Sequence, residues 1–186
     1  MRTSLRLVAA GILASAAGSA FAQEATKPTP EHLAMAKAAG VWDAEVKIWM
    51  QGPAAPPDVS NGTEEVTLLP GGLWMTSKYE GKMGDLPFSG RGITGYDPVK
   101  KKFVEVWVDS TDPHMLILEG DYDKESKSLT SYGKATEPRS GKPYDVKTVT
   151  THKGDDERGF VFYMKNDETQ GEYYKLLEMT YKRRSK

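Results

Sequence analysis

After Gly40, hydrophobic and polar residues alternate over short runs that continue almost to the end of the chain. The runs are rich in Val, Thr, Tyr, Phe and Trp, and clusters of Gly, Pro, Asp and Ser separate them. This pattern is typical of β-strands with one buried face. The predicted strands are Val41–Met50, Glu64–Leu69, Leu73–Glu80, Phe88–Tyr96, Phe103–Asp109, Met115–Tyr122, Ser128–Lys134, Tyr144–His152, Phe160–Lys165 and Tyr173–Lys182.

The connections between these strands favour a meander. Tyr96–Lys100 and Tyr122–Ser126 are similar turn sequences, each between two strand-like runs. No helical segment is predicted between the strands, which argues against parallel βαβ folds. Sequential antiparallel strands leave two exposed edges unless the sheet closes. We therefore predict an all-β fold, an up-and-down antiparallel barrel of about ten strands. An open sandwich is the alternative.

One short helix is predicted before the strands, over Pro30–Ala39. Thr29 can cap it, Pro30 suits its first turn, and Gly40 can end it. Its apolar stripe is small, so we expect the helix to pack on something larger.

The first 22 residues have the pattern of a secretory signal peptide. Arg2 and Arg6 precede an apolar stretch, Leu7–Ala20, and Ala20-Phe21-Ala22 is a small-x-small cleavage site. The stretch is too short and too rich in Ala and Gly for a membrane anchor. We expect cleavage after Ala22, a polar tether over residues 23–29, and a single barrel domain over residues 30–186. The expected location is the bacterial periplasm or the exterior.

Composition excludes several classes of function. The chain carries 25 Lys and Arg against 26 Asp and Glu, whereas nucleic-acid binding needs clustered positive charge. It contains no Cys, which excludes disulfide scaffolds, thiol catalysis and zinc–thiolate sites. No segment after the signal peptide is apolar enough to cross a membrane as a helix, so we expect no membrane insertion.

The strand Phe103–Asp109 has two distinct faces. Its three Val residues share one face, while Phe103, Glu105, Trp107 and Asp109 share the other. The mixed face is either the solvated outside of the sheet or the lining of a polar cavity around Trp107. Both interpretations remain open from the sequence.

If the barrel encloses a cavity, aromatic and charged residues on the strands are candidate ligand-binding residues. The tryptophans would stack on a ligand, and the arginine would pair with an acid of the ligand or of the protein. The candidates are Trp74, Arg91, Trp107, Asp109, Glu119 and Glu178.

Other motifs give weaker evidence for a chemical function. Gly90–Gly95 matches G-x-G-x-x-G, but a turn and a strand follow it instead of a helix, so we interpret its glycines as packing residues. Asn61-Gly62 is predicted to form a hairpin turn. His114 is the best-placed axial ligand for a haem, although a partly exposed loop histidine is favoured. Asp109 with Glu119 or Glu178 would form an acid–base pair only if they converge.

Two sets of residues resemble known families. Gly40-Val41-Trp42 resembles the Gly-x-Trp signature of calycin barrels, in which the tryptophan closes one barrel end under an N-terminal helix. A longer series of motifs resembles the bacterial family called domain of unknown function 1579. It comprises Gly71–Trp74, Tyr79–Gly81, Pro87–Phe88, Gly90–Gly92, Gly95–Asp97, Trp107–Ser110, Glu119–Asp123, Gly141–Pro143 and Glu178–Tyr181. The resemblance implies a calycin-related antiparallel barrel, often exported, and it carries no activity or catalytic residues.

The leading hypothesis is a non-enzymatic exported barrel that binds a small, partly apolar ligand in its interior. We expect no catalytic residues, no metal site and no resident cofactor. The alternatives are a structural or interaction barrel with no site, a hydrolase-like enzyme using paired carboxylates, and a haem-binding barrel.

Overall fold

The computed structural model describes residues 26–52 and 54–185. The predicted signal peptide, residues 1–22, and residues 23–25 of the predicted tether lie outside the described residues.

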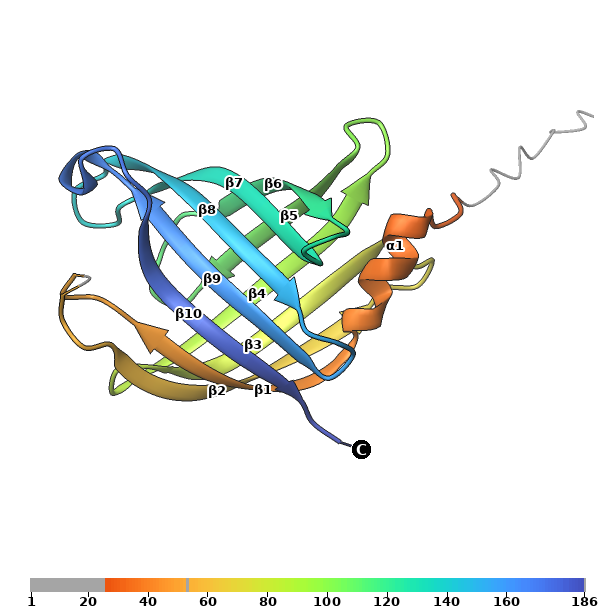
Figure 1. Cartoon of the computed structure of the whole chain (residues 1–186), viewed down its shortest axis with the longest axis horizontal. Coiled ribbons are helices and arrows are strands. Elements are labelled where there is room, and N and C mark those ends of the chain that lie inside the picture. The colour runs from red at the N-terminus through yellow and green to blue at the C-terminus, as the bar shows by residue number, and fades with distance from the viewer. Residues whose placement is uncertain (1–25, 53, 186) are drawn as a thin grey trace, which may run out of the picture.

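Ten antiparallel strands close into one barrel, in which every strand pairs with its sequence neighbours and β1 pairs with β10 (Figure 1). The prediction of an up-and-down barrel is therefore confirmed, and the open sandwich is excluded. The strands are β1 (Gly40–Ile48), β2 (Asp58–Leu68), β3 (Trp74–Met83), β4 (Leu86–Asp97), β5 (Lys102–Asp109), β6 (Leu116–Asp123), β7 (Ser128–Thr136), β8 (Pro143–His152), β9 (Glu157–Lys165) and β10 (Tyr174–Arg183).

The prediction of a turn at Asn61-Gly62 is wrong, because both residues lie inside β2. Gly62 pairs with Ala44 of β1. A Cβ atom on Gly62 would lie 2.0 Å from the Tyr79 hydroxyl, so this glycine leaves room for a side chain that lies over it. Glycine here serves packing within the sheet and not chain reversal.

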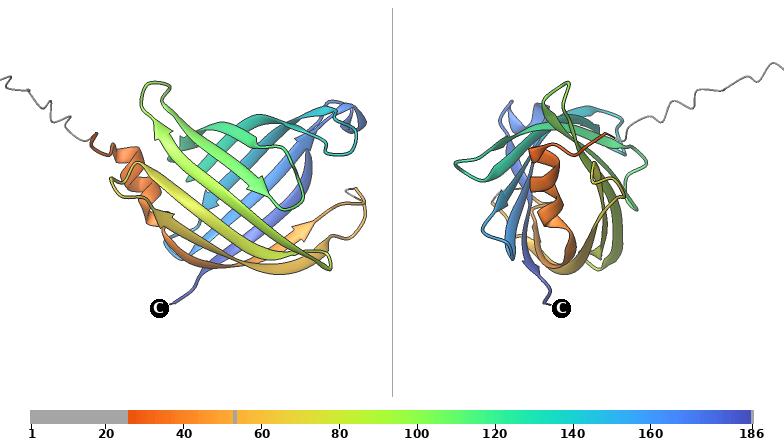
Figure 2. Two further views of the ribbon diagram at one scale, coloured as in Figure 1. Left: turned by 180° about the vertical axis from the view of Figure 1, so that it is seen from behind. Right: turned by 90° about the vertical axis from the view of Figure 1, so that its right-hand side faces the viewer.

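The helical segment consists of α1 (Pro30–Met35) and a 3₁₀ turn, η1 (Ala36–Ala38). The amide of Thr29 donates to Nδ1 of His32, 3.1 Å away, which fixes the start of α1. Seen from the side of the helix, α1 lies across one end of the barrel (Figure 2). Within the described residues, no helix has the length and apolar character needed to cross a membrane.

Trp42 and Arg183 hold this helical segment against the barrel. The indole Nε1 of Trp42 donates to the carbonyl of Ala38 at 2.9 Å. The guanidinium of Arg183 lies 4.1 Å from the Trp42 ring and donates to the carbonyl oxygens of Ala39 and Lys37. These bonds satisfy carbonyls at the end of the helix that would otherwise lack partners. The first strand, the last strand and the helix together seal this end.

The glycines of the G-x-G-x-x-G match lie within β4, as their interpretation as packing residues requires. A Cβ atom on Gly90 would lie 2.1 Å from the Trp107 ring, and one on Gly92 would lie 2.5 Å from the Ser77 hydroxyl. The Trp107 ring can therefore lie against the inner wall because Gly90 and Gly92 of β4 place no side chains beneath it.

We expect Gly90→Ala to destabilise the protein by about 1–3 kcal/mol, because the added methyl group would collide with the Trp107 ring. Gly159→Ala in β9 is the matched control, since the nearest atom to its Cβ would be 3.9 Å away. Urea denaturation of the two variants measures the difference. Equal stability of the two variants would contradict the packing role of Gly90.

Candidate functional site

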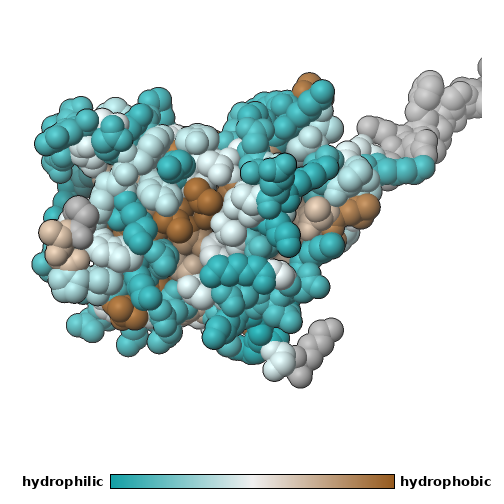
Figure 3. All heavy atoms as spheres, in the orientation of Figure 1, coloured by the Kyte–Doolittle hydropathy of each residue, from teal (hydrophilic) through white to brown (hydrophobic). Residues whose placement is uncertain are grey.

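The inner wall carries the mixed face of β5. Glu105, Trp107 and Asp109 line a cavity, whereas Val108, on the alternate face, is exposed to solvent. Of the two interpretations of this strand, the one with the mixed face inside is therefore the observed one. On the outer surface seen in Figure 3, hydrophilic residues cover most of the face, with a few hydrophobic residues near its centre.

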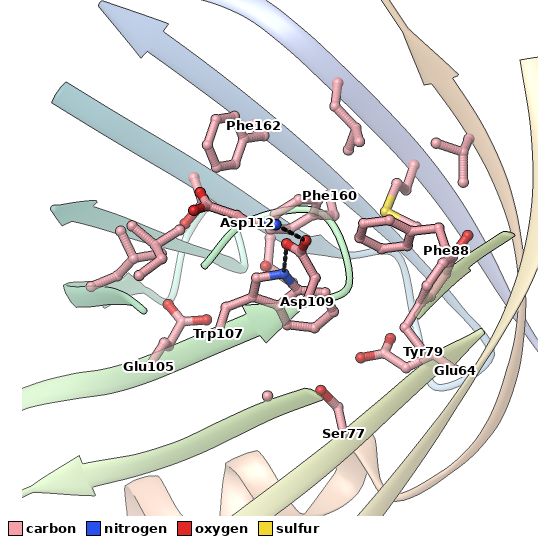
Figure 4. A pocket seen from close by; sticks show the side chains of 18 of the residues that line it. Glu64, Ser77, Tyr79, Phe88, Glu105, Trp107, Asp109, Asp112, Phe160 and Phe162 are labelled. Carbon is pink, nitrogen blue, oxygen red and sulfur yellow. Dashed lines mark hydrogen bonds between the residues drawn. The ribbon is translucent and has the colours of Figure 1, made fainter. Parts of the chain in front are cut away.

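The cavity has a volume of about 400 Å³. It runs from the helix-sealed end toward the loops at the opposite end, where Thr111 and Pro138 belong to its lining. Its wall is mostly apolar and aromatic, with a few polar groups (Figure 4). The larger apolar residues of the wall include Met75, Phe88, Leu118, Phe160, Phe162 and Met179.

A buried ion pair forms the floor of the cavity at the sealed end. Arg158 Nη2 donates to the carboxylate of Glu64, and the guanidinium lies between the rings of Trp42 and Tyr181, 4.6 and 4.3 Å from their centres. Burial without a partner would be very unfavourable for either charge, so each residue stabilises the other. The positive charge of Arg158 is thus already matched by Glu64.

Two tyrosines complete this floor. Burial raises the pKa of Tyr79 to about 12, and the negative charge of Glu64 adds to the shift. Burial likewise raises the pKa of Tyr181 well above its usual value. Both phenols are therefore neutral at physiological pH. Tyr79 Oη and Arg158 Nε have no hydrogen-bond partner within residues 26–52 and 54–185.

Glu105 lies halfway along the barrel, where its carboxylate faces the interior beside Trp107 (Figure 4). The hydroxyl of Ser131 on β7 donates to its Oε1 atom. This bond passes over β6 at Gly120, where a Cβ atom would lie only 2.1 Å from the Ser131 hydroxyl. Burial raises the pKa of Glu105, and the bond from Ser131 offsets part of that shift.

Asp109 fixes Trp107 and the loop after β5 at the open end of the cavity. Its Oδ2 atom accepts from Nε1 of Trp107 at 3.0 Å, which fixes the indole ring. Its Oδ1 atom accepts from the amide and hydroxyl of Thr111, at 2.8 and 2.7 Å, and from the amide of Asp112. Asp112 in turn contacts Nδ1 of His114 at 2.8 Å. Asp109 therefore orders the loop after β5.

Of the six predicted ligand-binding residues, Trp107 and Asp109 line the cavity and lie next to each other. The other four do not line it. Their expected placement inside the barrel is corrected, because each lies one residue out of phase with an inward-facing neighbour. Trp74 is 40% exposed on the outer wall; Arg91 pairs with Glu80, Glu119 with Lys100, and Glu178 with Lys175.

The predicted acid–base pair does not form. Asp109 faces the interior, whereas Glu119 and Glu178 are bound to lysines outside the cavity, 2.5 and 2.6 Å from their ammonium groups. His114 is a partly exposed loop residue, as favoured from the sequence. Within the described residues, no group of three or more potential ligand side chains is placed to hold a metal ion.

The sequence interpretation omitted several polar residues of the cavity. Glu105 carried a signal, because it alternates in phase with Trp107 on β5. Ser131, Glu64 and Arg158 carried none, since their roles depend on partners 26 to 94 residues away in the chain.

The family model described as "Protein of unknown function (DUF1579)" matches residues 27–183. No curated protein matches the chain.

We expect Glu105→Gln to stabilise the protein at pH 8 and to change its stability little at pH 4. Burial raises the pKa of Glu105 in the folded protein. The folded protein therefore binds a proton at the Glu105 carboxylate more tightly than the unfolded chain does. The stability of the natural protein therefore falls as pH rises from the unfolded pKa through the folded one, and glutamine removes that loss.

Urea midpoints at both pH values measure this effect. Glu119→Gln is the control, because that carboxylate is exposed and paired with Lys100. A Glu105→Gln variant that is less stable than the natural protein at pH 8 would show that the ionised carboxylate stabilises the fold.

Proposed function

The chain belongs to the family of proteins of unknown function DUF1579, and from its cavity we propose that it is a binding protein that takes a small, partly apolar molecule into the barrel. The cavity carries the proposal. Its volume of about 400 Å³ falls within the roughly 300–1,000 Å³ typical of sites for small molecules.

The make-up of the wall supports the same function. Ligand sites are mostly apolar with a few placed polar groups, and here Glu105, Tyr79 and Arg158 stand among aromatic and aliphatic side chains. Among the residues that the structure describes, the Tyr79 hydroxyl and Arg158 Nε have no hydrogen-bond partner, so they provide hydrogen-bonding capacity beside the cavity. Buried polar atoms normally have a partner.

A structural barrel with no site is the second candidate. It would need an interior filled by side chains or by one or two waters. A cavity of about 400 Å³ holds many times the roughly 30 Å³ that one water occupies in the liquid, which favours the binding function.

Blocking the cavity tests the proposal. We expect N-phenyl-1-naphthylamine, a neutral apolar dye, to bind saturably with one site per chain, and Ala135→Trp to weaken its binding at least about tenfold. Ala135 lines the cavity, so a tryptophan there would occupy the space of the dye. Fluorescence titration measures both affinities.

Lys134→Trp is the matched control. It places the same side chain at the neighbouring position of β7, where Lys134 points outward and pairs with Asp145. Circular dichroism verifies that both variants fold. Absence of saturable dye binding, or equal weakening by the two variants, would contradict a ligand site in the barrel.

We also propose that the protein is exported and processed after Ala22. The charged and apolar pattern of residues 1–22, followed by a small-x-small site, supports this. Expressed in a bacterium with an outer membrane, the full chain should be found in the periplasmic fraction with Gln23 as its first residue. Deletion of residues 2–22 should leave it in the cytoplasm, and an uncleaved chain in the cytoplasmic fraction would contradict export.

A further inference from the structure

The charges inside the barrel are unevenly matched. At the sealed end, Glu64 and Arg158 neutralise each other. Toward the open end, both carboxylate oxygens of Asp109 accept hydrogen bonds from Trp107 and the following loop. Between them, Glu105 has Ser131 as its hydrogen-bond partner, and no basic side chain of the described residues pairs with it. Asp109 also has no basic partner, but both of its oxygens are hydrogen-bonded. Within the described residues, Glu105 therefore differs in having neither a counter-charge nor a hydrogen bond to its second carboxylate oxygen.

The structure holds this carboxylate in a fixed place. Ser131 reaches it from two strands away, and Gly120 lies directly beneath the bond. A side chain at position 120 would displace the Ser131 hydroxyl, so three strands of the wall cooperate to orient Glu105. Ser131 itself is fully buried, so its hydroxyl has no competing contact with bulk solvent.

The surroundings of Glu105 are apolar and aromatic. Trp107 is the next inward residue on β5 and lines the cavity. Leu118 on β6, the partner of Glu105 in register, also lines it. Phe160 and Phe162 project from β9 into the same space (Figure 4). Aromatic faces attract organic cations, and an isolated carboxylate in an apolar site gains from a positively charged partner.

We propose that the ligand of this cavity is an amphipathic amine, whose ammonium group binds Glu105 and whose apolar body lies against Trp107 and the phenylalanines. This inference rests on the proposed binding function and specifies its ligand class. An ammonium at Glu105 donates hydrogen bonds to the free carboxylate oxygen and supplies the missing counter-charge. The apolar part fills the rest of the cavity.

An anionic ligand fits this wall less well. The guanidinium that could bind it, Arg158, is already paired with Glu64. An anion in the cavity would also approach Glu105 and Asp109 without a matching positive charge. Lys82 and His114 line only the region of the open end, and His114 is bound to Asp112 there.

Three probes with eight carbon atoms each test the inference on the full mature protein at pH 7. They are octylammonium, octanol and octanoate, which differ in the charge of the head group. Isothermal titration calorimetry should show octylammonium bound about tenfold or more tightly than octanol, and octanoate bound most weakly, because a charge-assisted hydrogen bond is stronger than a neutral one.

The variant Glu105→Gln should lose the preference. Its affinity for octylammonium should fall about tenfold, while its affinity for octanol stays within about twofold. Glu119→Gln is the matched control, because it removes one carboxylate from the outer wall and should keep the natural preference. The variant Glu105→Gln keeps a hydrogen-bond acceptor for Ser131, so it is expected to fold.

The outcomes separate this inference from the proposed function. The amine inference is overturned if the three probes bind equally, if octanoate binds more tightly, or if Glu105→Gln keeps the natural preference. If the dye still binds in such a case, the proposed binding function stands. If neither the dye nor any octyl probe binds the natural protein, the binding function itself fails.

Discussion

Pairing between β1 and β10 is the constraint on which the molecule depends. Seven residue pairs, from Trp42 with Arg183 to Ile48 with Leu177, turn a ten-stranded meander into a closed wall. Without this pairing, both edge strands would expose unpaired backbone groups. The inner face of the sheet would also have no opposite wall to enclose a cavity. The same two strands carry Trp42 and Arg183, so closure of the sheet and attachment of the helix are achieved by one set of residues.

The fold was predictable because its determinants are local. Alternation with a period of two marks each strand, and turn residues mark each connection, so all ten strands were located from the sequence. Thr29, Pro30 and Gly40 likewise marked the helical segment. The error at Asn61-Gly62 arose because a dipeptide common in tight turns here packs beneath a tyrosine from another strand. A contact of that kind has no local signature.

The site was predictable only in part, because the sequence does not say which phase of a strand faces inward. On β5 the mixed face could have been either side, and its true direction follows from the bare glycines of β4 that accommodate the Trp107 ring. For Trp74, Glu119 and Glu178 the residue type suggested the interior, while the register places them outside. The Glu64–Arg158 pair joins positions 94 residues apart, and only the closed barrel brings them together.

At one end of the barrel α1 lies across the sheet, and the Arg158 guanidinium stacks between the rings of Trp42 and Tyr181, so the cavity extends toward the loops at the opposite end. Under the proposed binding function, a ligand would enter and leave the cavity at that opposite end. That route passes the loops after β5 and β7 and requires no strand pair to separate. Loop motions take nanoseconds to microseconds, whereas local unfolding of a sheet is far slower. Under the proposed function, exchange of a ligand would thus not require the strands of the wall to separate, and a stable barrel could still bind and release it quickly.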